Sequence, residues 1–269
     1  MICFPNAKIN LGLFITEKLS NGYHALETCF YPVPIHDALE AVEAKKTSFH
    51  IAGSSIPGDP NQNLILKAYR LLKKDYQLPE LEIHLLKNIP MGAGLGGGSS
   101  DAAFMLRLLS ETYQLFLDDI ILEDYAAQIG SDCPFFIANE PAIGTGTGTD
   151  LEPIELSLKG LWLALIHPGI HISTKEAYAG VSPKESGINI RELIQSLDFK
   201  LWEKELKNNF EASIFPQHPQ LKLIKDNLYE SGAIYSAMSG SGSAMFGLFN
   251  EKPELNWIDD AHFSSTIQL

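Results

Sequence analysis

A run of glycines near residue 95 is the feature that most restricts how this chain can fold. Residues 89–103 read IPMGAGLGGGSSDAA, with five glycines ahead of two serines. An alternating apolar run at 81–85 precedes them, and residues 102–116 follow with helical spacing. This order predicts a strand, a glycine loop and a helix. Glycine lets the backbone approach a ligand, and a helix start presents unpaired N–H groups, so we predict a phosphate-binding loop.

The composition is that of a globular protein. The chain has 269 residues, 45% of them hydrophobic, enough for one large domain or two ordinary ones. Its net charge of −13, without a basic stripe, argues against a nucleic-acid partner. Cys3, Cys29 and Cys133 are odd in number and lack metal-ligand spacing, which indicates reduced thiols and a cytoplasmic location. We expect neither a signal peptide nor a membrane partner.

Apolar periodicity predicts alternating helices and strands along the rest of the chain. We expect helices at 64–76, 118–128, 190–208 (with a break) and 221–230, and strands at 9–15, 162–166, 233–238 and 243–249. Asn21 and Gly22 predict a hairpin turn. The glycine- and threonine-rich residues 144–150 suggest a domain boundary. The predicted domains are therefore 1–150 and 151–269.

Three familiar glycine loops fit poorly. A Walker loop needs lysine after its last glycine, whereas Gly98 is followed by Ser99. The Rossmann pattern is matched by Gly92, Gly94 and Gly97, but a run with this many glycines satisfies many patterns. In addition, the strand ending in an acidic residue that a Rossmann unit needs does not follow. The protein-kinase motifs His-Arg-Asp and Asp-Phe-Gly do not occur in the sequence.

A fourth kind of loop fits better. Residues 90–100 resemble the phosphate loop of the GHMP kinase superfamily, and residues 4–11 (FPNAKINL) and 238–244 (MSGSGSA) resemble its terminal motifs. Residues 21–24 (NGYH) and 130–136 (GSDCPFF) are similar to one branch, which phosphorylates the 2-hydroxyl of a CDP-linked methylerythritol in the non-mevalonate isoprenoid pathway. The motifs occur in the same order from about residue 4 to residue 249.

The resemblance implies an α+β fold of two domains. The N-terminal domain would resemble ribosomal protein S5 domain 2, and the C-terminal domain would be ferredoxin-like. The resemblance also implies ATP and Mg²⁺ as cofactors, a small-molecule substrate, and a cytoplasmic monomer or weak homodimer.

Lys8 and Asp132 are the catalytic pair that the resemblance implies. Without the resemblance, the simplest interpretation of Lys8 is a solvated lysine at a strand end, and that of Asp132 is a helix cap ahead of Pro134. Phosphoryl transfer to an alcohol needs a group that takes or orients the hydroxyl proton and positive charge near the transferring phosphoryl group. The resemblance assigns the first role to Asp132 and the second to Lys8.

The same resemblance implies the binding residues. Asn10, Tyr23 and His24 would bind the cytidine, with Tyr178 as a second aromatic against the base. Asn63 and Leu64 would line the adenine pocket, and Ser99 or Ser100 would be a candidate Mg²⁺ ligand. The ATP phosphates would be bound by Pro90, Met91, Gly92, Ala93, Gly94, Leu95, Gly96, Gly97, Gly98, Ser99 and Ser100. Asp101 places a carboxylate beside this loop, where it would favour the helix start.

Two alternatives stay open from the sequence. One is a mevalonate or homoserine kinase of the same superfamily, although such substrates have no cytosine for Tyr23 and His24 to bind. The other is a non-catalytic nucleotide-binding module, which the intact Lys8 and Asp132 disfavour.

Overall fold

A computed structural model describes residues 1–56, 59–184, 186–258 and 263–269. The chain forms two compact units, each made of separate segments. The first unit comprises Met1–Lys8, Pro32–Met91 and Gly96–Glu140, and the second comprises Ile9–Tyr31, Gly92–Leu95 and Pro141–Leu269. The division into domains 1–150 and 151–269 stays a prediction.

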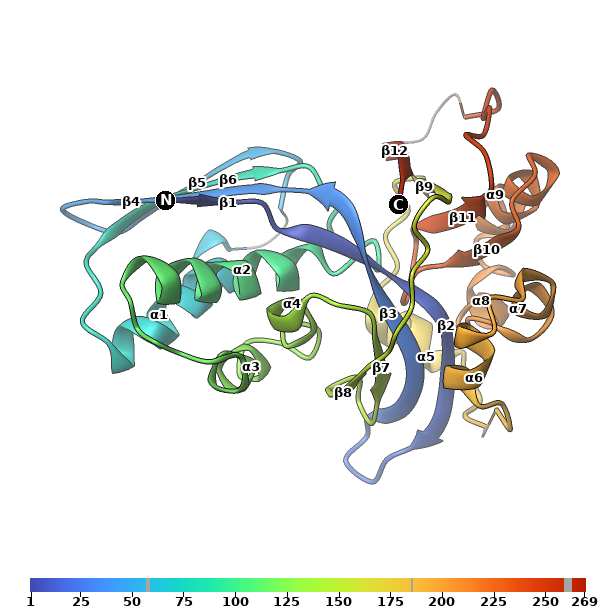
Figure 1. The fold of residues 1–269 in the computed structure, drawn as a ribbon, viewed down its shortest axis with the longest axis horizontal. Coiled ribbons are helices and arrows are strands. Elements are labelled where there is room, and N and C mark those ends of the chain that lie inside the picture. The colour runs from blue at the N-terminus through green and yellow to red at the C-terminus, as the bar shows by residue number, and fades with distance from the viewer. Residues whose placement is uncertain (57–58, 185, 259–262) are drawn as a thin grey trace. The chain divides into compact units, whose positions relative to one another are not determined.

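The first unit contains a four-stranded sheet with helices along one face (Figure 1). Its strands lie in the order β1 (Ile2–Cys3), β4 (Ala38–Glu43), β6 (Leu81–Lys87) and β5 (Ser48–Gly53). β5 pairs with β6 in parallel, whereas the other neighbours are antiparallel. Its helices are η1 (Pro60–Gln62), α1 (Leu64–Asp75), α2 (Gly97–Thr112), α3 (Asp119–Ala127) and α4 (Phe135–Ala138). Alternation along β6 buries Leu81, Ile83 and Leu85 on one face, which the helices cover.

The predicted strand, loop and helix are present as β6, the glycine loop and α2. However, α2 begins at Gly97 rather than at residue 102, so Ser99 and Ser100 lie within its first turns. α1 confirms the helix expected at 64–76, and Asn63 caps it by accepting a hydrogen bond from the N–H of Ile65 (2.9 Å).

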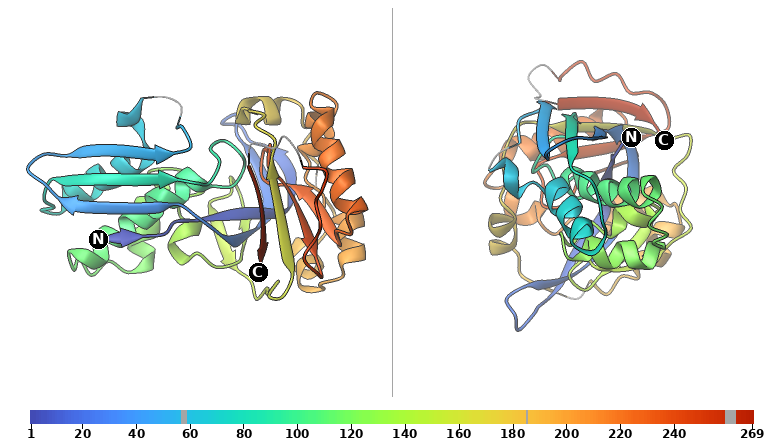
Figure 2. Two further views of the ribbon diagram at one scale, coloured as in Figure 1. Left: turned by 90° about the horizontal axis from the view of Figure 1, so that it is seen from above. Right: turned by 90° about the vertical axis from the view of Figure 1, so that its left-hand side faces the viewer.

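The second unit contains two further four-stranded sheets (Figure 2). One has the order β2 (Asn6–Lys18), β3 (His24–His36), β7 (Ala142–Thr145) and β8 (Asp150–Pro153), and the first residues of β2 and the last of β3 belong to the first unit. The other has the order β10 (Tyr235–Met238), β11 (Met245–Phe249), β9 (Trp162–His167) and β12 (Phe263–Gln268), and all its pairs are antiparallel.

Short helices complete the second unit. They are α5 (Thr174–Ala179), α6 (Ile190–Gln195), α7 (Phe199–Glu205), α8 (Glu211–Ile214) and α9 (Pro219–Glu230). α9 packs on β10 and β11, where its Leu221 and Leu228 are fully buried with Met245. The expected break in the helix at 190–208 occurs at Leu197, whose φ is 49°. The predicted hairpin turn at Asn21 and Gly22 is also present, between β2 and β3.

The structure adds features that periodicity missed. The edge strand β12 was not predicted, and residues 146–149 form the turn between β7 and β8. Cys3, Cys29 and Cys133 are all unpaired thiols. Among the residues that the structure describes, no helix is long and apolar enough to span a membrane.

Candidate active site

Lys8 and Asp132 come together within the first unit. The Lys8 side chain on β2 is only 4% exposed, and its Nζ lies 3.7 Å from Asp132 Oδ2. Asp132 lies in the turn before α4, and its side chain is 36% exposed. Pro134 occupies the N-cap position of α4, so Asp132 does not cap this helix. The pair therefore combines an anchored cation with a carboxylate that solvent can reach.

Burial controls the electrostatics of this pair. Burial lowers the pKa of Lys8 below its usual value, and the charge and hydrogen bond of Asp132 act in the opposite direction. Because an ammonium is poorly solvated inside a protein, Lys8 gives up its proton at a lower pH than an exposed lysine does. Asp132 is the neighbour that favours its charged form.

Gly96 brings the glycine loop against Lys8. Its φ is +71°, which a side chain would strain. A Cβ atom there would lie 2.8 Å from Cζ of Phe136 and 3.1 Å from Cγ of Lys8. The part of the loop that enters α2 therefore packs directly on Lys8.

The start of α2 offers hydrogen-bond donors. Gly96 is its N-cap, and within the described chain no side chain caps it. Its first N–H groups and the positive end of the helix dipole favour an anion such as phosphate. Ser100 Oγ is buried and has no hydrogen-bond partner among the described residues. A bound phosphate oxygen or Mg²⁺ would satisfy this hydroxyl.

A pocket in the first unit opens beside the loop. Its volume is about 220 Å³, and Asn63, Leu64, Met91, Gly98 and Ile51 contribute to its lining. The expected adenine residues thus lie next to the first turn of α2. No group of three or more His, Cys, Asp or Glu side chains in the described part of the chain could hold a metal ion.

A buried charge cluster behind the loop escaped the sequence analysis. Lys87 Nζ donates to Asp101 Oδ2 (2.8 Å) and to Asp37 Oδ2, and all three side chains are at most 3% exposed. Asp37 Oδ1 also accepts the N–H groups of Asn88 (2.6 Å) and Ile89 (2.8 Å), where the loop begins. The signal was present, because Lys87 follows Leu81, Ile83 and Leu85 in the inward register of β6.

The first half of the glycine loop belongs to the second unit. There, a Cβ atom on Gly94 would lie 2.0 Å from the carbonyl oxygen of Ser239. Ser239 Oγ donates to the carbonyl of Gly94 (2.9 Å), and the N–H of Ala244 donates to the carbonyl of Ala93 (3.1 Å). The C-terminal glycine motif therefore packs against the first half of the glycine loop.

Two of the expected cytidine residues also meet in the second unit. The rings of His24 and Tyr178 are stacked, with centroids 4.8 Å apart, and Phe210 contacts Tyr178 edge-on at 4.9 Å. Tyr23 is 67% exposed in the hairpin turn. Asn10 is buried, and its Nδ2 donates to Thr28 Oγ1 (3.0 Å). A base held between Tyr23 and Tyr178 stays a prediction.

Comparison with known proteins matches both halves of the chain to one family. Residues 63–140 match the model for the GHMP kinases N terminal domain, and residues 190–257 match GHMP kinases C terminal. The 4-diphosphocytidyl-2-C-methyl-D-erythritol kinase of Bacteroides thetaiotaomicron is 53% identical over 264 residues, 96% of each chain. The enzyme of the same name from Parabacteroides distasonis is 52% identical and covers 94% of this chain and 93% of its own.

Solved structures agree with these matches. A crystal structure of 4-(cytidine 5'-diphospho)-2C-methyl-D-erythritol kinase superposes with a TM-score of 0.80 at 32% identity, over 92% of this chain and 90% of that one. The homoserine kinase of Cytophaga hutchinsonii has a TM-score of 0.65 at 16% identity, over 91% of this chain and 85% of its own, and shares the fold alone.

Proposed function

The chain belongs to the 4-diphosphocytidyl-2-C-methyl-D-erythritol kinase family of GHMP kinases, and from this we propose which of its residues bind the two substrates and which carry out the phosphoryl transfer. The enzyme is a phosphotransferase that moves the γ-phosphoryl group of ATP to the 2-hydroxyl of 4-diphosphocytidyl-2-C-methyl-D-erythritol. This reaction serves the non-mevalonate route to isoprenoid precursors. The full-length matches to this branch of the superfamily favour it over a mevalonate or homoserine kinase.

Lys8 and Asp132 carry the chemistry in this proposal. The supporting observation is their 3.7 Å approach, with Lys8 buried and Asp132 open to a ligand. Asp132 orients the acceptor hydroxyl and accepts its proton as the bond to phosphorus forms. Lys8 stabilises the negative charge on the acceptor oxygen and the transferring group. Since the transition state of phosphoryl transfer is loose, positioning and charge contribute more than strong base catalysis.

The glycine loop and the start of α2 bind the nucleotide. Their N–H groups hold the phosphates, and the pocket lined by Asn63 and Leu64 takes the adenine. The buried hydroxyl of Ser100 supports a role in holding Mg²⁺, with Ser99 as the alternative ligand. Mg²⁺ would supply positive charge to the phosphates when bound.

The cytidine end of the substrate binds in the second unit. The stacked rings of His24 and Tyr178 offer an aromatic surface for the base, and the exposed Tyr23 side chain can close on it. Asn10, two residues after Lys8 on β2, would bind the cytidine as well. A cytoplasmic monomer or weak homodimer stays our prediction.

An acceptor panel tests the proposed function. Purified protein with ATP and Mg²⁺ should release ADP when given 4-diphosphocytidyl-2-C-methyl-D-erythritol, and should release none above background with mevalonate or homoserine. The cytidine group is the reason, because only this acceptor reaches His24 and Tyr178. Turnover of mevalonate or homoserine without turnover of the cytidine compound would overturn the assignment.

The pH profile tests the role of Lys8. Burial lowers the pKa of Lys8, and the ammonium is the active form, so kcat should fall at the alkaline end at a lower pH than an ordinary lysine would give. Asp132→Asn removes the charge that raises this pKa, so the alkaline limb of its residual activity should move to still lower pH. Lys8→Arg should abolish the limb. A limb at the same pH in the wild type and Asp132→Asn would exclude Lys8 as its source.

A further inference from the structure

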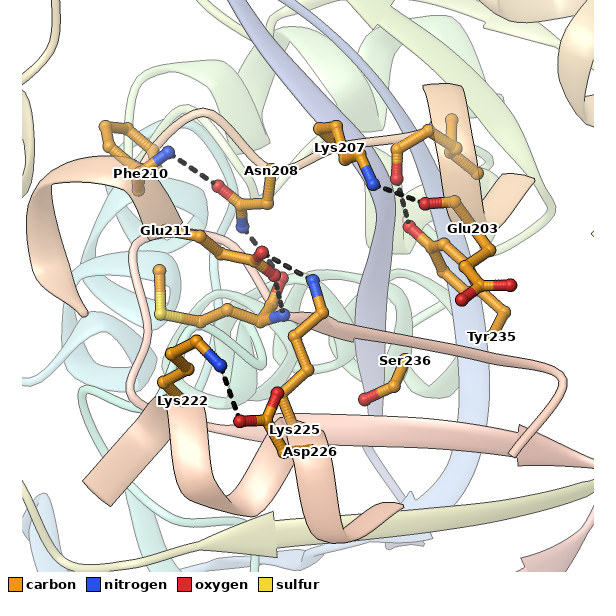
Figure 3. Close-up of polar contacts among 12 residues, drawn as sticks. Glu203, Lys207, Asn208, Phe210, Glu211, Lys222, Lys225, Asp226, Tyr235 and Ser236 are labelled. Carbon is orange, nitrogen blue, oxygen red and sulfur yellow. Dashed lines mark hydrogen bonds and ion pairs between the residues drawn. The ribbon is translucent and has the colours of Figure 1, made fainter. Parts of the chain in front are cut away.

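Three side chains outside every recognised motif gather at the end of β10 (Figure 3). They are Asn208, in the loop between α7 and α8, Glu211 on α8, and Lys225 on α9. Asn208 is 3% exposed and Glu211 is 8% exposed. All three belong to the second unit, and we refer to them as the β10-end cluster. Buried polar groups of this kind are stable only when they are well hydrogen-bonded.

The β10-end cluster holds the backbone of the last strand residue and of the turn after it. Asn208 Nδ2 donates to the carbonyls of Met238 (2.7 Å) and Gly240 (2.8 Å). Glu211 Oε1 accepts the N–H of Met238 (2.8 Å). Both backbone groups of Met238 are thus bonded to side chains, at an edge strand that would otherwise need another partner.

Lys225 supports this arrangement by its charge. Its Nζ donates to Glu211 Oε2 (2.6 Å), and the two side chains are 16% and 11% exposed. A second ion pair on the same helix is exposed to solvent instead. Lys222 and Asp226 contact at 2.5 Å, and their side chains are 61% and 47% exposed. Lys222 is therefore a matched control for Lys225 (Figure 3).

The turn held by this cluster is the one that contacts the phosphate loop. Ser239 lies between Met238 and Gly240, and its Oγ donates to the carbonyl of Gly94 (2.9 Å). Ser239 Oγ also accepts the N–H of Asn10 (3.3 Å). A Cβ atom on Gly240 would lie 3.2 Å from the carbonyl of Gly94, so the two backbones are in close contact. A displacement of the turn would therefore disturb residues 92–95 of the loop.

We propose that Asn208, Glu211 and Lys225 are positioning residues that set the phosphate loop for nucleotide binding, acting through the Ser239 turn. This inference rests on the proposed function of the loop as the ATP site. None of the three side chains is proposed to contact a substrate. Substituting them should therefore weaken binding of the nucleotide and leave binding of the acceptor's base unchanged.

Asn208→Asp is the most informative variant. Aspartate keeps the oxygen that accepts the N–H of Phe210 (2.9 Å), and Phe210 packs against Tyr178. It loses both donated hydrogen bonds and turns an acceptor toward two carbonyls. Calorimetric titration with ADP should show affinity weakened about tenfold, and titration with CDP should show a change under about twofold. Asn189→Asp is the control, because aspartate caps α6 as well as Asn189 does.

Two results would overturn the proposal: unchanged ADP affinity in folded Asn208→Asp, or equal losses for ADP and CDP. If this variant gives no cooperative thermal transition, Lys225→Met decides. It should weaken ADP binding about threefold while Lys222→Met leaves it unchanged, and equal behaviour of the two lysine variants would contradict the inference. Both titrations are independent of turnover, so a wild type inactive on the cytidine acceptor would overturn the proposed function alone.

Discussion

Replacing Asp132 with asparagine should lower kcat by about 10²- to 10⁴-fold. Asparagine keeps the shape of the side chain but cannot accept the proton of the acceptor hydroxyl. It also removes the charge that stabilises the buried Lys8 ammonium. Steady-state kinetics with the cytidine acceptor measures the effect. ATP affinity should change little, since we propose that the nucleotide binds through the glycine loop and the start of α2.

Asp118→Asn is the matched control for this prediction. Asp118 caps α3 by accepting the N–H of Ile121 (2.9 Å), and asparagine caps a helix equally well. This variant should keep wild-type kcat and stability. A fully active Asp132→Asn would remove Asp132 from the mechanism and leave positioning by the loop and Lys8 as the source of rate.

Lys87→Met should cause the largest loss of stability, about 3–5 kcal/mol in the free energy of unfolding at neutral pH. Lys87 is the cation shared by the buried carboxylates of Asp37 and Asp101. Without it, the two buried carboxyl groups have no neutralising cation in a site that excludes water. Urea denaturation followed by circular dichroism measures the loss.

The pH dependence of that loss identifies its cause. Burial raises the pKa of Asp101, Lys87 opposes this, and the charge of Asp37 adds to it. A carboxyl whose pKa is raised by folding destabilises the fold when ionised, so stability returns as pH falls through the raised pKa. The defect of Lys87→Met should therefore be smaller at about pH 5.5 than at about pH 7.5.

Lys73→Met provides the comparison within the same unit. Lys73 pairs with Glu80 at 2.5 Å, but the two side chains are 31% and 43% exposed. Its loss of stability should be much smaller, because water solvates the charges of both partners. Equal losses for Lys87→Met at the two pH values would mean that packing, rather than buried charge, is the cause.

Local signals predicted local structure well. The alternation before the loop, the glycines and the apolar spacing after them predicted β6, the loop and α2, and the apolar spacing at 64–76 predicted α1. The start of α2 was predicted too late, because glycine has low helix propensity by itself. Close packing explains why glycine stands at this helix start, because a Cβ atom on Gly97 would lie 2.8 Å from Lys87 Nζ.

For the candidate site, the sequence predicted the residues that stand in motifs and missed most of those that do not. The motifs led to Lys8, Asp132 and the loop, and the structure brings Lys8, Asp132 and Gly96 together. Tyr178 lies in no motif and was a candidate from the family resemblance alone; its ring stacks on His24. Asp37 and Lys87 were missed because neither stands in a motif, although Lys87 interrupts an apolar register.

The motifs and their order alone were enough to identify the family and the chemistry of a kinase, because each motif depends on residue types at short spacing. The tertiary structure alone decided which distant side chains share a buried site. Lys87 with Asp37 and Asp101, and the β10-end cluster behind the Ser239 turn, are examples. Such contacts depend on how helices and strands pack, and only that packing excludes the water that would otherwise screen their charges.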